Sequence, residues 1–123
     1  MTLRILVLYV TAGAGHRRAA EAVTHALSHA FPQAAVECHD LLEDVPRWLR
    51  RAYPETYYAL VRFLGWFWGL CFEAFDHPLI YSLVQPFRHA WNRRMARRCI
   101  QRLQRDPPDV IIATHFFPAD VVS

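Results

Sequence analysis

Residues 4–16 read RILVLYVTAGAGH, and this stretch decides the fold class. The run from Ile5 to Val10 is short, apolar on both faces and rich in branched side chains, which is typical of a buried strand in a parallel sheet. The small-residue loop 11–15 follows, and apolar residues at helical spacing predict a helix from about His16 to Phe31, ended by a proline. This order predicts an α/β fold with a Rossmann-like parallel sheet and flanking helices.

The remainder of the chain extends this pattern. A second strand is predicted over residues 34–38, which completes a βαβ unit with a right-handed crossover, and a third strand over residues 109–113. A long helical stretch is predicted over about residues 79–105, with an interruption near Pro86. Three strands and a helix that begins just before the chain ends form an incomplete doubly wound sheet. We therefore expect residues 1–123 to be one domain, the N-terminal part of a longer protein.

Composition limits the class of protein. The chain has 123 residues, 54% of them hydrophobic, which suffices for one packed domain and argues against disorder. All 14 basic residues are arginine and the net charge is only +3, so the placement of the charges matters more than their sum.

Cys38, Cys71 and Cys99 are far apart and form no CxxC pair, so we expect no metal site and no disulfide framework. No secretory signal is visible in residues 1–10, and a cytoplasmic location is expected.

Gly13, Gly15 and His16 lie where the predicted first strand passes into the helix. Glycines here let the backbone turn tightly and approach a ligand, and the free N–H groups of the helix start favour an anionic or strongly polar group. A purely structural turn is one alternative. A dinucleotide site is another, since Asp40 follows at about the 20-residue distance of that motif, but its third glycine would fall at Arg18. No Gly-Lys-Ser/Thr follows, so the Walker A pattern is absent.

His16 is the candidate catalytic residue of this loop. It occupies the first turn of the predicted helix, where its imidazole can face a cleft beyond the carboxyl end of the strand. The helix dipole favours the neutral form of a histidine at this end, and a neutral imidazole can take a proton from a sugar or glycerol hydroxyl. The alternative is a surface or capping histidine without a catalytic role.

Several of these segments resemble a known family. They are Leu6–Leu8, Thr11–Ala22, Asp40, Pro54, Tyr57 and Asp109–Pro118. The strand, the glycine-rich loop ending in Gly-His and the alanine-rich helix resemble the opening motif of the monogalactosyldiacylglycerol synthases and the related processive diacylglycerol glucosyltransferases, and the third-strand segment resembles their Thr-His motif. The likeness runs from Leu3 to about Val121. Ala14 replaces a glycine of the family pattern, and the order Phe-Phe-Pro after His115 differs from it.

The resemblance implies a GT-B glycosyltransferase, of which this chain is the N-terminal half on the acceptor and membrane side. It implies transfer of a hexose from a UDP-sugar to diacylglycerol or a related lipid, with inversion, no cofactor and no obligatory metal. His16 matches the loop histidine of the family and is carried over as base or acceptor-positioning group; His115 is a weaker candidate. The expected acceptor-loop residues are Gly13, Ala14, Gly15, Thr114 and His115. The UDP-sugar is expected to bind the absent C-terminal domain, so this fragment alone is expected to be inactive.

The segment Tyr57–Phe75 is strongly apolar, but Arg62 and Glu73 interrupt it, and the uncharged stretch between them is too short to span a bilayer. Aromatic rings favour the membrane interface, so an interfacial segment is predicted. The expected membrane contacts in it are Trp66, Phe67 and Trp68. The alternative is a pair of core helices packed on the sheet.

Basic residues gather on one face of the later helical stretch, opposite an apolar stripe from Trp91 to Leu103. Beside an aromatic segment, such a face suits anionic lipid headgroups, at about 1 kcal/mol per arginine near the surface. The expected lipid contacts are Arg93, Arg94, Arg97 and Arg98. A solvated helix face is the alternative. Nucleic acid is not an expected partner, because no DNA- or RNA-binding motif is recognisable. The protein is thus expected at the membrane surface as a peripheral protein.

Two other functions stay open. An NAD(P)-dependent oxidoreductase domain fits the strand–loop–helix order, although Arg18 stands in place of the third glycine. A non-catalytic module that binds anionic lipids fits the aromatic and basic segments, and it would bind liposomes without transferring sugar.

Overall fold

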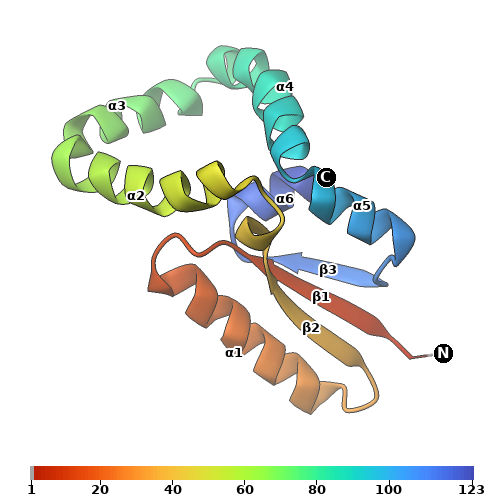
Figure 1. Ribbon diagram of the computed structural model, residues 1–123. Helices are drawn as coiled ribbons and strands as arrows, with labels where there is room; N and C mark the ends of the chain where they lie inside the picture. Colours follow the sequence, from red (N-terminus) through yellow and green to blue (C-terminus); the bar gives the residue numbers. More distant parts are fainter. Residues whose placement is uncertain (1) are drawn as a thin grey trace.

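The fold is built on a parallel β-sheet, seen in a computed structural model that describes residues 2–123 (Figure 1). Within these residues the sheet has three strands in the order β2-β1-β3, and both pairings are parallel. The strands are β1 (Arg4–Tyr9), β2 (Ala35–Asp40) and β3 (Val110–Ala113). The prediction of an α/β fold with a Rossmann-like parallel sheet and flanking helices is confirmed.

The central strand β1 explains why the opening sequence is apolar throughout. It is paired on both edges, with Leu6 opposite Glu37 of β2 and Ile111 of β3. Helix α1 (Ala14–Ala30) covers one face of the sheet and α5 (Arg97–Arg105) lies over the other (Figure 1). The four residues from position 5 to 8 are consequently at most 6% exposed. A strand buried on both faces has no polar side, which is the pattern the sequence shows.

A hydrophobic cluster lies beyond the carboxyl ends of the strands. The 3-10 turn η1 (Leu41–Glu43) and helix α6 (Phe116–Val122) meet α5 there. Its buried members are Val10, Ala12, Leu41, Leu42, Val45, Ala96, Cys99, Phe117 and Val121. Burial raises the pKa of the Cys99 thiol to about 11, so this cysteine is a packing residue and not a nucleophile. The cluster fixes the loops after β1 and β3 relative to one another.

The long helical stretch is divided at a different place from the one predicted. Helix α4 (Pro78–Met95) continues through Pro86, and the chain breaks instead at Ala96, before α5. A proline inside a helix removes one backbone hydrogen bond. Helix α4 has no buried residue and stays continuous in spite of this loss. Ala96 is fully buried, and the turn at this residue allows α5 to lie against the sheet.

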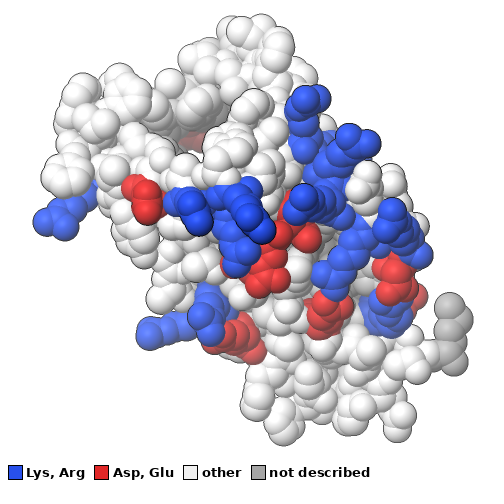
Figure 2. Space-filling view, viewed as in Figure 1, with Lys and Arg blue, Asp and Glu red and all other residues white. Residues whose placement is uncertain are grey.

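Three consecutive helices, α2 (Arg47–Phe63), α3 (Gly65–Asp76) and α4, form an arm that leaves the sheet and returns to it (Figure 1). None of these three helices, all of which lie within residues 2–123, contains a buried residue. Phe63, Trp66 and Leu83, one from each helix, are each 73% exposed. Figure 2 shows a hollow inside this arch. The alternative prediction of a core helix pair packed on the sheet is therefore wrong.

Among the helices described, none combines the length and the hydropathy that crossing a bilayer would require.

Asp120 of α6 holds the returning end of the arm. Its carboxylate accepts hydrogen bonds from Asn92 Nδ2 at 2.7 Å and from Arg88 Nη2 at 3.3 Å. Arg93 donates to the carbonyl oxygen of Val121 at 2.9 Å. Burial alone would raise the pKa of Asp120, but the hydrogen bonds from Asn92 and Arg88 outweigh burial and the pKa is lowered. The ionised carboxylate thus joins α4 to α6.

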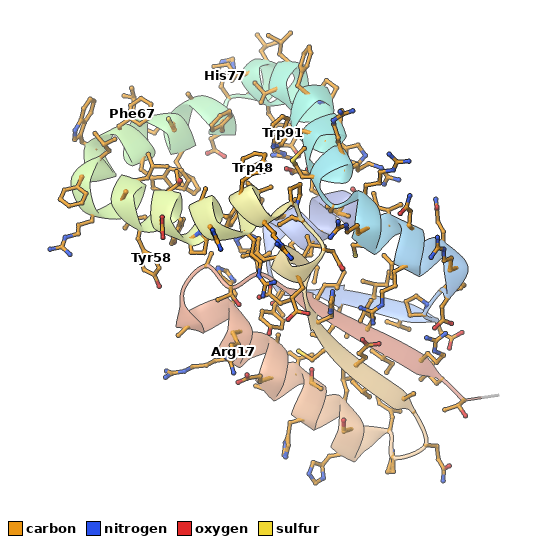
Figure 3. All side chains as sticks on the ribbon, viewed as in Figure 1. Arg17, Trp48, Tyr58, Phe67, His77 and Trp91 are labelled. Atoms are coloured by element: carbon orange, nitrogen blue, oxygen red, sulfur yellow. The ribbon has the colours of Figure 1, made fainter. Side chains whose placement is uncertain are left out.

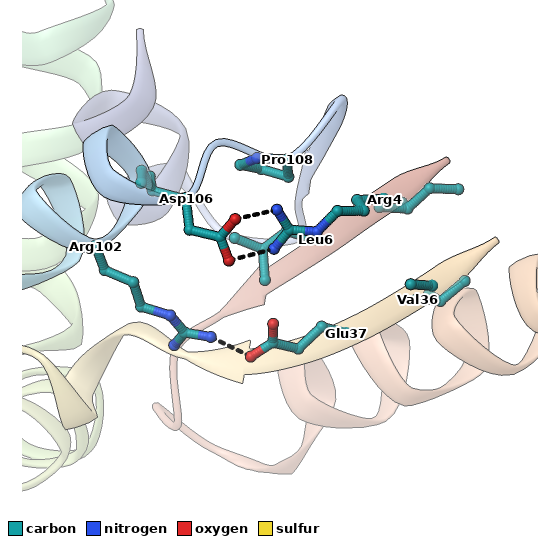
Figure 4. Close-up of a pocket in the computed structure, with 10 residues that line it drawn as sticks. Arg4, Leu6, Val36, Glu37, Arg102, Asp106 and Pro108 are labelled. Atoms are coloured by element: carbon teal, nitrogen blue, oxygen red, sulfur yellow. Dashed lines mark hydrogen bonds and ion pairs between the residues drawn. The ribbon is translucent and has the colours of Figure 1, made fainter. Parts of the chain in front are cut away.

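A cavity of about 210 Å³ lies at the amino ends of the strands, between the sheet and α5 (Figure 4). Two ion pairs cross it, Arg4 with Asp106 and Arg102 with Glu37. These pairs connect α5 and the segment before β3 to the strands β1 and β2. Because ligands of open α/β sheets bind at the opposite, carboxyl ends of the strands, we assign this cavity a structural role.

Candidate functional site

A second cavity, of about 530 Å³, lies at the carboxyl ends of β1 and β3. The first turn of α1, the end of β3 with the loop after it, and α6 form one side of it, and helices α2 and α3 of the arm form the other. The predicted residues His16, Thr114 and His115 line it together. Of the predicted loop residues, Gly13 precedes α1 and Ala14 and Gly15 are its first two residues, and none of the three lines the cavity. The lining residues are His16, Tyr57, Trp68, Phe72, Ala113, Thr114, His115, Phe116 and Ala119.

Gly13 is the residue that makes the turn from β1 into α1 possible. It precedes the first helical residue, Ala14, with φ 87° and ψ 168°, a region of backbone space that only glycine adopts readily. A Cβ atom at this position would also lie 3.4 Å from the hydroxyl of Tyr58, which α2 directs toward this loop (Figure 3). The turn places His16 in the first turn of α1, at the edge of the cavity.

Replacing Gly13 by alanine is expected to lower the free energy of unfolding by about 1–3 kcal/mol, because the backbone conformation is strained for any residue with a Cβ atom. Urea unfolding followed by circular dichroism measures the change. Gly15→Ala is the matched control. This glycine lies inside α1 with nothing within 4 Å of an added Cβ, so the change should be neutral or stabilising by up to about 1 kcal/mol. Equal stability of the two variants would contradict the role of Gly13.

His16 is held in one tautomer by the loop after β3. Its Nδ1 lies 2.9 Å from the carbonyl oxygen of Thr114, and a carbonyl only accepts, so Nδ1 carries the proton. The hydroxyl of Thr114 in turn donates to the carbonyl oxygen of His16 at 3.2 Å. Nε2 of His16 is therefore left with a lone pair. An imidazole that is oriented through Nδ1–H and presents a bare Nε2 is the arrangement that general base catalysis uses.

His115 packs against His16 and is held in the opposite tautomer. The backbone N–H of Phe117 donates to Nδ1 of His115 at 3.1 Å, which caps the start of α6, so the proton of His115 is on Nε2. The ring centroids of His115 and His16 are 4.5 Å apart with the planes perpendicular. Burial, and to a smaller extent His16, lowers the pKa of His115 to about 4. His115 is thus a neutral donor and a poor base near pH 7, and His16 is the better candidate for the base.

Asp40, the residue expected to bind a ribose in a dinucleotide site, has a structural role. One carboxylate oxygen accepts from the backbone N–H groups of Thr11, at 3.3 Å, and Leu42, at 3.0 Å. The other accepts from the hydroxyl of Thr11 at 2.5 Å. Both oxygens are therefore used to hold the loop after β1 against η1. This geometry argues against the NAD(P)-dependent oxidoreductase alternative, in which the acidic residue binds the ribose.

The sequence did not indicate the aromatic wall of the cavity. Tyr57 lies 6.3 Å from Trp68, and Trp68 lies 5.3 Å from Phe72, measured between ring centroids. Trp68 was predicted to contact a membrane, but it is half-buried in this wall, whereas Trp66 and Phe67 are 73% and 42% exposed. The i, i+4 spacing of Trp68 and Phe72 is the signal that places both on one face of α3. Phe67 lies on the part of the arm far from the sheet (Figure 3).

The arginines predicted to contact lipid divide into two kinds. Arg93 is partly buried and donates to the carbonyl oxygen of Val121, so part of its role is structural. Arg94, Arg97 and Arg98 are exposed, and among the described residues no carboxylate lies within 4.0 Å of them. Figure 2 shows basic side chains gathered along the flank of α5 and the base of the arm, with acidic residues between them.

Comparisons with known proteins agree on one family. A family model described as monogalactosyldiacylglycerol (MGDG) synthase matches residues 16–123, a range that includes His16, Thr114 and His115 but not Gly13. A curated protein of Arabidopsis thaliana, monogalactosyldiacylglycerol synthase 1, chloroplastic, is 29% identical over 113 residues, which cover 91% of the chain. The chain spans about 20% of the length of that relative. No solved structure matches the chain.

Proposed function

The chain belongs to the monogalactosyldiacylglycerol synthase family, and from this premise we propose that it is the acceptor-side domain of a lipid glycosyltransferase. The enzyme transfers a hexose from a UDP-sugar to a hydroxyl of diacylglycerol or a related lipid. The UDP-sugar is a co-substrate, no resident cofactor is needed, and the domain that binds it belongs to the same longer polypeptide. The two domains together form a GT-B arrangement with the reaction in the cleft between them.

The observation that carries this proposal is a cavity with two histidines at one end and aromatic rings along its wall. Its volume of about 530 Å³ lies within the usual range of ligand sites, roughly 300–1,000 Å³. An amphipathic acceptor lipid fits both the histidine end and the aromatic wall of this cavity. Its hydroxyl lies at His16 and His115, and its acyl chains lie against Tyr57, Trp68 and Phe72 and continue onto the exposed apolar surface of the arm.

In the proposed reaction His16 acts as general base. Its Nε2 takes the proton of the acceptor hydroxyl while the oxygen forms a bond to the anomeric carbon of the sugar. The bond between that carbon and the β-phosphate oxygen breaks, and UDP leaves with the electron pair. Attack from the face opposite UDP inverts the configuration. The hydrogen bond from Nδ1 to Thr114 stabilises the imidazolium that results, because it points the positive ring at a carbonyl oxygen.

The arm is the proposed site of membrane contact. Its far part, residues 63–87, contains only two Asp, Glu, Lys or Arg residues, Glu73 and Asp76. The two ends of the arm that join the sheet domain are basic. The arginines there are Arg47, Arg50 and Arg51 at the start of α2, and Arg93, Arg94, Arg97 and Arg98 at the junction of α4 and α5. Apolar residues at the far end and arginines at the base fit insertion to the depth of the headgroups, where each arginine contributes about 1 kcal/mol on an anionic surface.

A transfer assay tests the proposed activity. The full-length polypeptide that contains this domain is given radiolabelled UDP-galactose or UDP-glucose and diacylglycerol in mixed micelles, and labelled lipid is separated by thin-layer chromatography. We expect labelled monohexosyl diacylglycerol with one of the two donors.

Two results would contradict the proposal in different ways. Reduction or oxidation of a nicotinamide cofactor with any substrate would support the oxidoreductase alternative instead. Strong liposome binding by the full-length polypeptide, with no transfer from either donor, would identify a non-catalytic lipid-binding module.

A further inference from the structure

We propose that His16 and His115 act as a hydroxyl-binding pair that selects a neutral alcohol as the acceptor. The inference rests on the proposed transfer reaction at the same cavity, and it gives His115 a positioning role in that reaction. Both rings line this cavity and lie at a right angle, with 4.5 Å between their centroids.

The two histidines offer opposite hydrogen-bonding groups. His16 donates through Nδ1 to the carbonyl oxygen of Thr114, which leaves the lone pair of Nε2 available. His115 accepts through Nδ1 from the backbone N–H of Phe117, which leaves the proton on Nε2. Among the described residues neither Nε2 has a hydrogen-bond partner, and both residues line the cavity, so each Nε2 is available to a ligand. One ring therefore presents an acceptor and the other a donor.

An alcohol hydroxyl matches both the hydrogen-bond acceptor of His16 and the donor of His115. Its oxygen donates one proton, to Nε2 of His16, and accepts one hydrogen bond, from Nε2–H of His115. A protonated amine has no lone pair for His115, and an ionised phosphate or carboxylate has no proton for His16. A ligand that leaves the Nε2 of one histidine unmatched should therefore bind roughly 10–100-fold more weakly than an alcohol.

Burial is the main reason that the ring of His115 stays neutral, and two titratable groups face this ring. They are His16 from α1 and Tyr53 from α2, whose ring centroid is 6.4 Å from that of His115. Burial raises the pKa of Tyr53 to about 12, so its hydroxyl stays neutral. Burial and His16 lower the pKa of His115 to about 4, so His115 keeps one proton near pH 7. The donor on His115 is therefore constant while His16 changes its charge in catalysis.

Nuclear magnetic resonance of the chain with ¹⁵N-labelled histidine tests the pair without any need for activity. We expect the Nε2–H tautomer for His115 and the Nδ1–H tautomer for neutral His16. Adding 1,2-dihexanoylglycerol should shift both Nε2 signals, and the analogue with an amine in place of the hydroxyl should bind at least about tenfold more weakly. Equal binding of the two ligands, or an Nδ1–H tautomer for His115, would overturn the proposal.

The variant His115→Asn separates positioning from helix capping. Asparagine is a preferred N-cap residue whose side-chain oxygen can accept the N–H of Phe117, but it has no group equivalent to Nε2–H. We expect the variant to fold with a modestly lower midpoint of urea unfolding, because part of a buried ring is lost, and to show about tenfold weaker binding of 1,2-dihexanoylglycerol and no preference over the amine. In the full-length enzyme, KM for the acceptor should rise and the acid limb of the pH–rate profile should remain, because His16 is still the base.

Three other results of these measurements would each lead to a different conclusion about His115. Wild-type binding and preference in His115→Asn would show that His115 is only a cap and would overturn the pair. Loss of the acid limb would show that His115 is itself the base. An intact pair by magnetic resonance in a protein that transfers no sugar would leave the hydroxyl site standing and reject the proposed glycosyl transfer.

Discussion

Replacing His16 by alanine is expected to lower kcat for sugar transfer by about 10²–10⁴-fold, the usual contribution of a general base. Without Nε2 of His16 no group in the cavity is placed to take the hydroxyl proton, since His115 is held as a neutral donor with its lone pair occupied by Phe117. Initial rates of the full-length enzyme at saturating UDP-sugar and acceptor measure the effect. KM for the acceptor should change much less than kcat.

The control for this variant is His25→Ala, in the same helix. His25 is exposed and packs against His29, at 4.6 Å between centroids, so its removal should leave kcat within about twofold of wild type, as expected for a surface change. The free energy of unfolding of His16→Ala, measured by urea unfolding, should fall by no more than about 1.5 kcal/mol, the value of one hydrogen bond to Thr114. Wild-type kcat in His16→Ala would remove the base assignment while leaving family membership intact.

The triple variant Phe63→Ser, Trp66→Ser and Leu83→Ser is expected to weaken binding to lipid vesicles by at least about 100-fold. Each side chain is 73% exposed in the protein, and burying a large apolar side chain contributes about 1.5–3 kcal/mol, so even partial insertion gives a loss of several kcal/mol over three sites. Cosedimentation with phosphatidylcholine vesicles, with and without phosphatidylserine, measures the binding. Binding to the anionic vesicles should weaken further as salt is added, because the exposed arginines contribute through charge.

The matched control carries serine at Leu3 and Phe31, which are 41% and 49% exposed and lie on the sheet domain away from the arm. It should bind vesicles as the wild type does. The arm variant should unfold at the same urea concentration as the wild type, because none of its three sites is buried. Equal binding by both variants and the wild type would contradict the proposed membrane contact of the arm.

The sheet domain was predictable because its signals are local. A short run that is apolar on both faces is typical of a strand covered on both sides, and Gly13 marks the turn that needs a positive φ. The interruption predicted at Pro86 was wrong, because α4 continues through this proline in spite of the backbone hydrogen bond that it removes. The true break at Ala96 follows from a long-range contact with the buried cluster, which no local pattern reports.

The candidate site was predictable only in part. His16 and His115 lie at the ends of two strands that pair with one another, so the topology alone brings them together. Their tautomers depend on backbone groups of Thr114 and Phe117, which spacing cannot reveal. The aromatic segment likewise gave no indication that Trp68 faces the cavity while Trp66 faces outward, because both belong to one run of aromatic residues on a helix without a clear apolar face.

The central claim is that an acceptor hydroxyl lies at Nε2 of His16, inside the cavity between the sheet domain and the arm. A crystal structure of the protein with 1,2-dihexanoylglycerol tests it most directly. We predict the free hydroxyl oxygen within about 2.6–3.2 Å of His16 Nε2, with the acyl chains against Tyr57, Trp68 and Phe72. A glycerol bound elsewhere, or a hydroxyl directed away from His16 toward solvent, would contradict the account.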